Sequence, residues 1–201
     1  MTTTMTRNQN IHKLVVCAML AAIIIVMAFT PIGYLKIGPV SITFLTIPVV
    51  IGAVVLGPAA GAVLGGIFGL TSFFQCFGMD AFGTVLCGIN PFFTFVMCVI
   101  PRVCIGLFSG LLFRALSKVD KTRIVSFIAS TLLGAITNTI LFVGLLILFF
   151  SGTEIVQQNL GSNVWEIILA LVTANSLIEI AVCAVVGTAI SKVITRFVIK
   201  Q

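Results

Sequence analysis

The sequence predicts an all-α membrane protein, a bundle of six transmembrane helices that forms a single domain over residues 1–201. Its 201 residues are 60% hydrophobic and only 8% charged, whereas about a quarter of the residues in an average soluble domain carry a charge. A membrane-spanning helix needs about 20 mostly apolar residues, and the chain has room for about six such runs. Little polar sequence remains between these runs, so no separate soluble module is expected.

The placement of the basic residues predicts how the helices cross the membrane. The formal net charge is +6, but the basic residues neither gather on one soluble face nor alternate with exposed aromatic residues, so no nucleic-acid partner is expected. All but Lys36 and Arg102 fall at the ends of apolar runs in three groups, which the positive-inside rule places in the cytoplasm. Both termini are therefore predicted to be cytoplasmic, which demands an even number of spans. The groups are Arg7 and Lys13; Arg114, Lys118, Lys121 and Arg123; and Lys192, Arg196 and Lys200.

The first helix is expected from about His12 to Phe29. Ala18, Ala21 and Ala22 form a patch of small side chains on it. Two of them, Ala18 and Ala22, have the i, i+4 spacing that lets another helix approach closely. The patch is therefore a candidate contact surface for a second helix.

The segment from Thr30 to Phe44 interrupts the apolar sequence with two prolines and two glycines. Residues 40–44 alternate between apolar and hydroxyl side chains, a pattern typical of a strand, so an outer hairpin is expected here. Tyr34 and Lys36 are its amphipathic and charged tips. A lid over the mouth of the bundle is the functional interpretation, and a simple connector is the alternative, since long ordered loops are often but not always functional.

Two helices follow, from about Leu45 to Leu56 and from Gly57 to about Gln75, joined by an inner turn. The second helix has a glycine at every fourth position, which leaves a smooth groove on one face and predicts a tightly packed neighbour. Its outer end is polar, and Gln75 there is a candidate binding residue. The glycines are Gly57, Gly61, Gly65 and Gly69.

The next helix, from Asn90 to about Leu116, carries the most informative residue of the chain. An outer loop over residues 77–90 precedes it, and Asn90 followed by Pro91 is typical of a helix cap and first turn. Arg102 lies near the middle of this helix, where an arginine costs roughly 2.5–3.5 kcal/mol on translocon scales. Such a residue normally faces a bundle interior, a partner acid or a bound anion, so Arg102 is a candidate binding residue.

The neighbours of Arg102 support this interpretation. Pro101 removes one backbone hydrogen bond from the helix and is expected to kink it, and a kink beside a buried charge is typical of a binding pocket. Gly106 and Gly110 continue the stripe of Arg102 at four-residue spacing. The face of the arginine is therefore predicted to be the closely packed, inward face.

Two further helices, over residues 123–149 and 164–194, bring more polar side chains to the same depth. At about 1.5 Å per residue, Asn138 and Asn175 lie about 16 Å from the outer ends of their helices, against about 14 Å for the arginine. Glu179 lies one turn deeper than Asn175 on the same face. All of these groups would be costly if they faced lipid, so we expect them to converge inside the bundle.

Two arrangements fit these residues. Glu179 neutralises Arg102 within a static network, or it only orients Arg102, whose free donors then bind an anionic substrate bidentately. A lid and a polar outer mouth favour the second arrangement. The sequence has no H-x-x-x-H or C-x-x-C metal set, no nucleophile with a histidine base and no phosphate loop, so no catalytic site, cofactor or metal is expected.

With these residues, the chain resembles the S components of energy-coupling factor (ECF) vitamin transporters, the membrane subunits that bind the substrate. The resemblance covers most of the chain, and the pattern is most similar to the pantothenate-type branch. It rests on Ala18 to Ala22, residues 30–44, the LGPAAGAVLGGIFGLTS run at 56–72, Ile100-Pro101-Arg102 with the residues that follow, and NSLIEI at 175–180.

The resemblance implies a multi-pass protein of the bacterial plasma membrane that captures a vitamin from outside under its loop lids. It further implies delivery by toppling, within the lipid, against a transmembrane coupling subunit of the EcfT type, driven by two cytosolic ATPases. Ala18 and Ala22 would dock on the coupling subunit. ATP hydrolysis in partner subunits agrees with the lack of a nucleotide-binding motif here.

The branch implies pantothenate, a monoanion with hydroxyl and amide groups, as the substrate. Folate stays open, since it would want aromatic stacking and a second cation that Lys36 could provide. A neutral pyrimidine or pyridoxine-like precursor would need no arginine, and Arg102 would then be structural. The candidate binding residues are Arg102, Asn138, Asn175, Glu179, Gln75, Asn90, Tyr34 and Lys36.

A different class of protein also fits part of this pattern. In a structural or assembly protein, Arg102 and Glu179 would only staple two helices together. The lid distinguishes the two classes, because a stapling protein has no use for ordered outer loops or for polar groups open to the outside.

Overall fold

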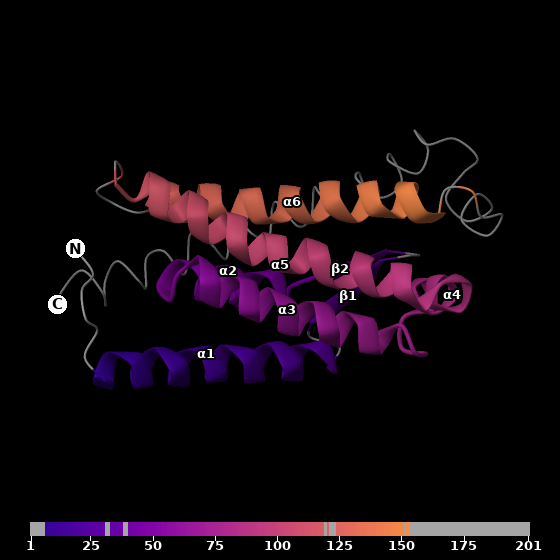
Figure 1. Ribbon diagram of the computed structural model, residues 1–201, viewed down its shortest axis with the longest axis horizontal. Coiled ribbons are helices and arrows are strands. Elements are labelled where there is room, and N and C mark those ends of the chain that lie inside the picture. The colour runs from indigo at the N-terminus through magenta and orange to yellow at the C-terminus, as the bar shows by residue number, and fades with distance from the viewer. Residues whose placement is uncertain are drawn as a thin grey trace.

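The computed structural model describes residues 7–30, 33–37, 40–118, 120, 124–150 and 152. Within these ranges the chain forms six helices and one two-stranded hairpin (Figure 1). The predicted last helix, with Asn175 and Glu179, lies outside the described residues. The elements are α1 (Arg7–Ala28), β1 (Tyr34–Ile37), β2 (Val40–Thr43), α2 (Thr46–Val55), α3 (Pro58–Gln75), α4 (Ala81–Ile89), α5 (Pro91–Leu116) and α6 (Ile124–Phe150).

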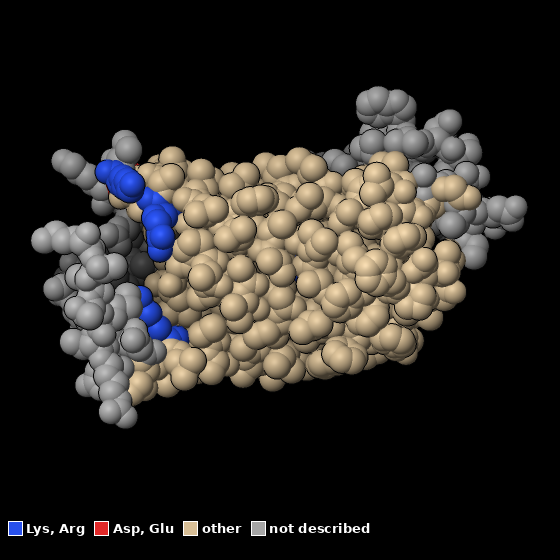
Figure 2. Space-filling model, viewed as in Figure 1, with Lys and Arg blue, Asp and Glu red and all other residues tan. Residues whose placement is uncertain are grey.

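Four of the described helices, α1, α3, α5 and α6, are long and apolar enough to cross a membrane. They extend along the long axis of the molecule (Figure 1), and Figure 2 shows basic side chains at one end and none along the flank in view. Leu14 and Leu148 are 72% and 71% exposed, as expected of side chains that face lipid. The predicted all-α membrane bundle is thus confirmed in the described part, whereas six spans and cytoplasmic termini stay predictions.

The prediction of an outer loop over residues 77–90 is wrong for most of the segment, because Ala81–Ile89 forms the short helix α4. The Asp80 carboxylate caps this helix by accepting a hydrogen bond from the backbone N–H of Gly83 at 2.8 Å. Leu86 is fully buried in a hydrophobic cluster with Val143 and Leu146 of α6. Packing and the cap therefore outweigh the glycines, which favoured a loop in the sequence.

The outer hairpin predicted from the alternating residues is present. Strands β1 and β2 pair antiparallel, with Tyr34 opposite Thr43 and Ile37 opposite Val40. The N–H of Phe44 donates to the carbonyl of Gly33 at 3.0 Å and closes the base of the hairpin. Whether the hairpin acts as a lid stays a prediction.

The glycine groove of α3 packs against α5, as predicted. Gly61 lies against the carbonyl oxygen of Gly106, and Gly65 lies against that of Arg102. A Cβ atom added to Gly61 would lie 2.6 Å from the Gly106 oxygen, closer than side chains approach a carbonyl in practice. The backbone contact at Gly65 also fixes where Arg102 sits along the bundle.

We expect Gly61→Ala to lower the thermal stability of the protein in detergent, because the added methyl group forces α3 away from α5 and from Ala53 of α2. Overpacking of this kind costs about 1–3 kcal/mol. Gly144→Ala on α6 is the matched control, since a Cβ atom there meets nothing within 4 Å. Equal melting temperatures for the two variants would show that the α3–α5 contact is looser than the structure has it.

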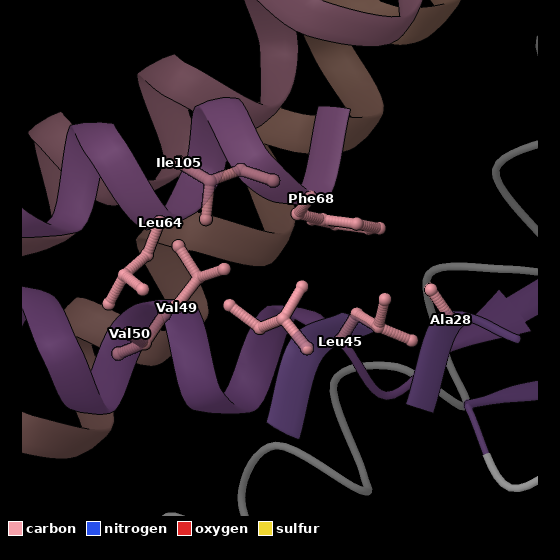
Figure 3. Close-up of a cluster of buried hydrophobic side chains, with 8 residues drawn as sticks. Ala28, Leu45, Val49, Val50, Leu64, Phe68 and Ile105 are labelled. Atoms are coloured by element: carbon pink, nitrogen blue, oxygen red, sulfur yellow. The ribbon is translucent and has the colours of Figure 1, made fainter. Parts of the chain in front are cut away.

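A hydrophobic core joins α1, α2, α3 and α5 beside this groove (Figure 3). Phe68 is completely buried in it. Because Phe68 also contacts the guanidinium of Arg102, the core holds one wall of the candidate site in place. Its buried members are Ile24, Ala28, Leu45, Val49, Val50, Leu64, Phe68 and Ile105.

Candidate binding site around Arg102

Arg102 faces the interior of the bundle and is only 9% exposed. Its Nη1 donates a hydrogen bond to the carbonyl oxygen of Met97 at 3.0 Å. A helical side chain leans toward the N-terminus of its own helix, so the guanidinium extends back along α5 rather than toward the basic end of the bundle. The cation therefore sits deep among helices, at a position where a counter-charge or a bound anion is needed.

Side chains from two neighbouring helices, α3 and α6, surround the guanidinium. The Cζ atom lies 5.5 Å from the centre of the Phe68 ring on α3 and 5.3 Å from that of Phe142 on α6. Both distances fall within the range of cation–π attraction. Nη2 makes a long contact of 3.5 Å with Ser72 Oγ, and Nε has no hydrogen-bond partner among the described residues. One edge of the guanidinium, Nε and Nη2, is thus available to an acceptor.

Asn138 lies on the face of α6 that packs against α5. It is one turn after Gly134, where a Cβ atom would lie 2.7 Å from Ser109 Oγ of α5, and one turn before Phe142. Asn138 therefore lies between two contacts with the arginine helix, at the depth of the site. Its Oδ1 is buried and has no hydrogen-bond partner among the described residues.

Ser109 adds a third open polar atom, since its fully buried Oγ also has no partner among the described residues. Buried polar groups are nearly always hydrogen-bonded, because an unpaired one costs about 1–3 kcal/mol. Three buried polar atoms can therefore form a hydrogen bond with a bound molecule or with residues outside the described ranges: Arg102 Nε, Asn138 Oδ1 and Ser109 Oγ.

Two predicted site residues are engaged elsewhere in the structure. Gln75 Nε2 donates to the carbonyl of Ala28 and so ties the end of α3 to the end of α1. Asn90 Oδ1 accepts from the backbone N–H groups of Phe92 and Phe93 at 3.1 and 3.2 Å, which makes Asn90 the N-cap of α5. The predicted cap is confirmed, and the structure shows neither side chain in hydrogen-bond contact with Arg102.

The remaining predicted residues are placed less fully. Tyr34 and Lys36 lie on strand β1 of the outer hairpin. Asn175 and Glu179 lie outside the described residues, so the predicted contact of Glu179 with Arg102 stays a prediction.

The alanine patch on α1 is split between two faces. Ala18 and Ala22 are exposed, whereas Ala21 packs against the hydrophobic core. Large apolar side chains flank the exposed pair, and Met19 is 61% exposed. Helix α1 lies at the edge of the described bundle (Figure 1), and Ala18 and Ala22 lie on its exposed side.

Sequence reasoning missed the residues that enclose the guanidinium: Ser72, Phe68 and Phe142. Phe142 lies four residues after Asn138, and Phe68 lies four residues before Ser72, so helical spacing around the polar residues could have found them. Ser109 lies seven residues after Arg102, on the same stripe of α5, and the same spacing could have found it.

Four described helices are long and apolar enough to cross a membrane, and α3, α5 and α6 bury an arginine whose Nε has no hydrogen-bond partner among the described residues. This arrangement is typical of a membrane protein that binds a polar molecule. The sequence from residue 12 to 191 matches the family described as ECF transporter, substrate-specific component, and the chain belongs to that family. It is therefore a substrate-binding membrane subunit, located in the bacterial cell membrane and crossing it several times.

Two relatives extend over most of the chain. The "Pantothenate transporter PanT" of Leuconostoc mesenteroides subsp. mesenteroides is 28% identical over 196 residues, which cover 93% of this chain and 94% of the relative. The "Pantothenic acid transporter PanT" of Lactococcus lactis subsp. cremoris is 30% identical over 169 residues, which cover 79% of this chain and 80% of the relative. The family predicted from the sequence is confirmed.

Proposed function

We propose that this chain captures pantothenate outside the cell as the substrate-specific subunit of an ECF transporter. Both relatives above are named for transport of this vitamin. The observation that carries the proposal is Arg102, a buried cation whose Nε has no partner among the described residues. Pantothenate carries one carboxylate, which matches this single cation in charge.

The guanidinium offers its Nε and Nη2 edge to the carboxylate. Nη1 is held by the Met97 carbonyl, and the contact of Nη2 with Ser72 is long enough to yield to a stronger acceptor. A carboxylate can bridge Nε and Nη2 through two parallel hydrogen bonds. Phe68 and Phe142 keep water from the faces of the guanidinium, and low local polarity strengthens the pairing.

Asn138 Oδ1 is the acceptor for the hydroxyl and amide groups of the vitamin. We expect Asn138→Ala to weaken pantothenate binding about three- to tenfold, the usual value of one neutral hydrogen bond. Pantothenol, in which an alcohol replaces the carboxylate, keeps these hydroxyl and amide groups and should lose affinity by the same factor. Isothermal titration of the purified protein measures both, and an unchanged affinity for both would remove Asn138 from the site.

Further residues of this chain, together with partner subunits, complete the binding site and couple it to transport. Glu179 orients Arg102, and Asn175 supplies a second amide from the last helix. The hairpin with Tyr34 and Lys36 closes over the bound vitamin, beside the polar outer ends that carry Gln75 and Asn90. The exposed face at Ala18 and Ala22 docks on a transmembrane coupling subunit, and two cytosolic ATPases supply the energy.

The test is to purify the chain in mild detergent, denature it and identify any released small molecule by mass spectrometry. We expect pantothenate, because a capturing subunit that binds tightly carries its ligand through purification. A neutral molecule in its place would keep the transporter function and make Arg102 a helix staple. An empty preparation that also fails to bind added pantothenate would contradict the proposal.

A further inference from the structure

We propose that Pro101 is a positioning residue for Arg102 and thereby makes the site selective for carboxylates. It withholds a backbone N–H, which leaves the Met97 carbonyl free to anchor the guanidinium. This inference rests on the proposed function, because the selectivity it explains is that of the pantothenate site.

The hydrogen bonds of α5 leave the Met97 carbonyl without its usual backbone donor. In an α-helix the N–H of each residue donates to the carbonyl four residues earlier, so the carbonyl of Met97 would normally pair with residue 101. Proline has no N–H, and Met97 is 2% exposed, which leaves little access for water. A buried carbonyl without a donor is costly. Arg102 Nη1 supplies the missing donor at 3.0 Å.

The anchor decides which edge of the guanidinium is offered. An arginine side chain has many rotamers, and fixing it only when a ligand arrives lowers the affinity for that ligand. With Nη1 held by Met97 and the group lying beside Phe68 and Phe142, the Nε and Nη2 edge is set before binding. Pro101 thus acts on the ligand through Arg102 and does not touch it.

Replacing the proline by alanine tests this role. Pro101→Ala restores an N–H that competes for the Met97 carbonyl, and alanine is well tolerated in a helix. We expect pantothenate to bind about tenfold more weakly, the value of a charge-assisted anchor, while the affinity for pantothenol changes less than about twofold. Pro91→Ala is the matched control, because the first residue of α5 has no N–H bond within the helix to restore. Neither affinity should change in that variant.

A double-mutant cycle separates positioning from a purely structural effect. In the Arg102→Gln background, Pro101→Ala should have no further effect on either ligand. Equal losses for pantothenate and pantothenol, or the same loss without the arginine, would overturn the inference. If the wild type prefers pantothenate and Pro101→Ala keeps that preference, this inference alone fails. If the wild type binds both ligands equally, Arg102 does not recognise the carboxylate and this inference fails while pantothenate capture stands; if the wild type binds neither ligand, the proposed function fails as well.

Discussion

Replacing Arg102 by glutamine is expected to weaken pantothenate binding about a hundredfold. Removing one partner of a buried charge pair costs 2–5 kcal/mol, and about 2.8 kcal/mol corresponds to a hundredfold change. Glutamine keeps polarity and much of the length but supplies neither the charge nor the paired donors. Pantothenol binding should change far less, because pantothenol has no carboxylate that could pair with Arg102. Isothermal titration of the purified variants measures both affinities.

Two further variants separate the loss of charge at Arg102 from a general loss of positive charge and from the loss of the guanidinium geometry. Arg114→Gln removes a cation from the exposed end of α5, far from the site, and should leave both affinities unchanged. Arg102→Lys keeps the charge but loses the fork geometry, so its pantothenate affinity should lie between those of the wild type and Arg102→Gln. A folded Arg102→Gln protein that binds pantothenate as the wild type does would reduce Arg102 to a helix staple.

The second large effect is expected on α1. Ala22→Trp places a bulky ring on the exposed small-residue face and blocks close approach of another helix. Vitamin uptake by cells that carry the complete transporter should fall at least about tenfold. Pantothenate binding by the purified subunit should stay the same, because Ala22 lies on the exposed face of α1 and not among the residues around Arg102.

Ile140→Trp is the control for side-chain size on a lipid-facing surface. Ile140 is 64% exposed on α6, and α6 and α1 lie on opposite sides of the described helices (Figure 1). Uptake should be close to the wild-type rate in this control. If Ala22→Trp transports at the same rate as Ile140→Trp, the coupling subunit docks on another face.

Several features of the fold and of the candidate site could be predicted from the sequence because they follow local rules. The four-residue glycine spacing of α3 specified a close neighbour, and the structure places Gly61 against Gly106. The alternation over residues 40–44 specified a strand, and β2 forms there. Arg102 was expected inside the bundle because lipid cannot solvate it, and it is buried.

Other features depend on contacts between segments far apart in the chain, which local rules cannot supply. Helix α4 forms because Leu86 is buried in a cluster with side chains of α5 and α6, although the glycines of this segment favour a loop. Gln75 is a polar residue at the outer end of α3, as expected of a binding residue, yet its amide donates a hydrogen bond to the carbonyl of Ala28. The aromatic rings around Arg102 come from two other helices, and their partner is defined only once those helices pack.

The most direct test of the central claim is the relative affinity of the wild-type protein for pantothenate and pantothenol. The two molecules differ at one end, where the first has the carboxylate assigned to Arg102 and the second has an alcohol. Isothermal titration of ligand-free protein should show a preference for pantothenate of about a hundredfold. Equal affinities would show that the buried arginine does not bind the carboxylate and would contradict the account.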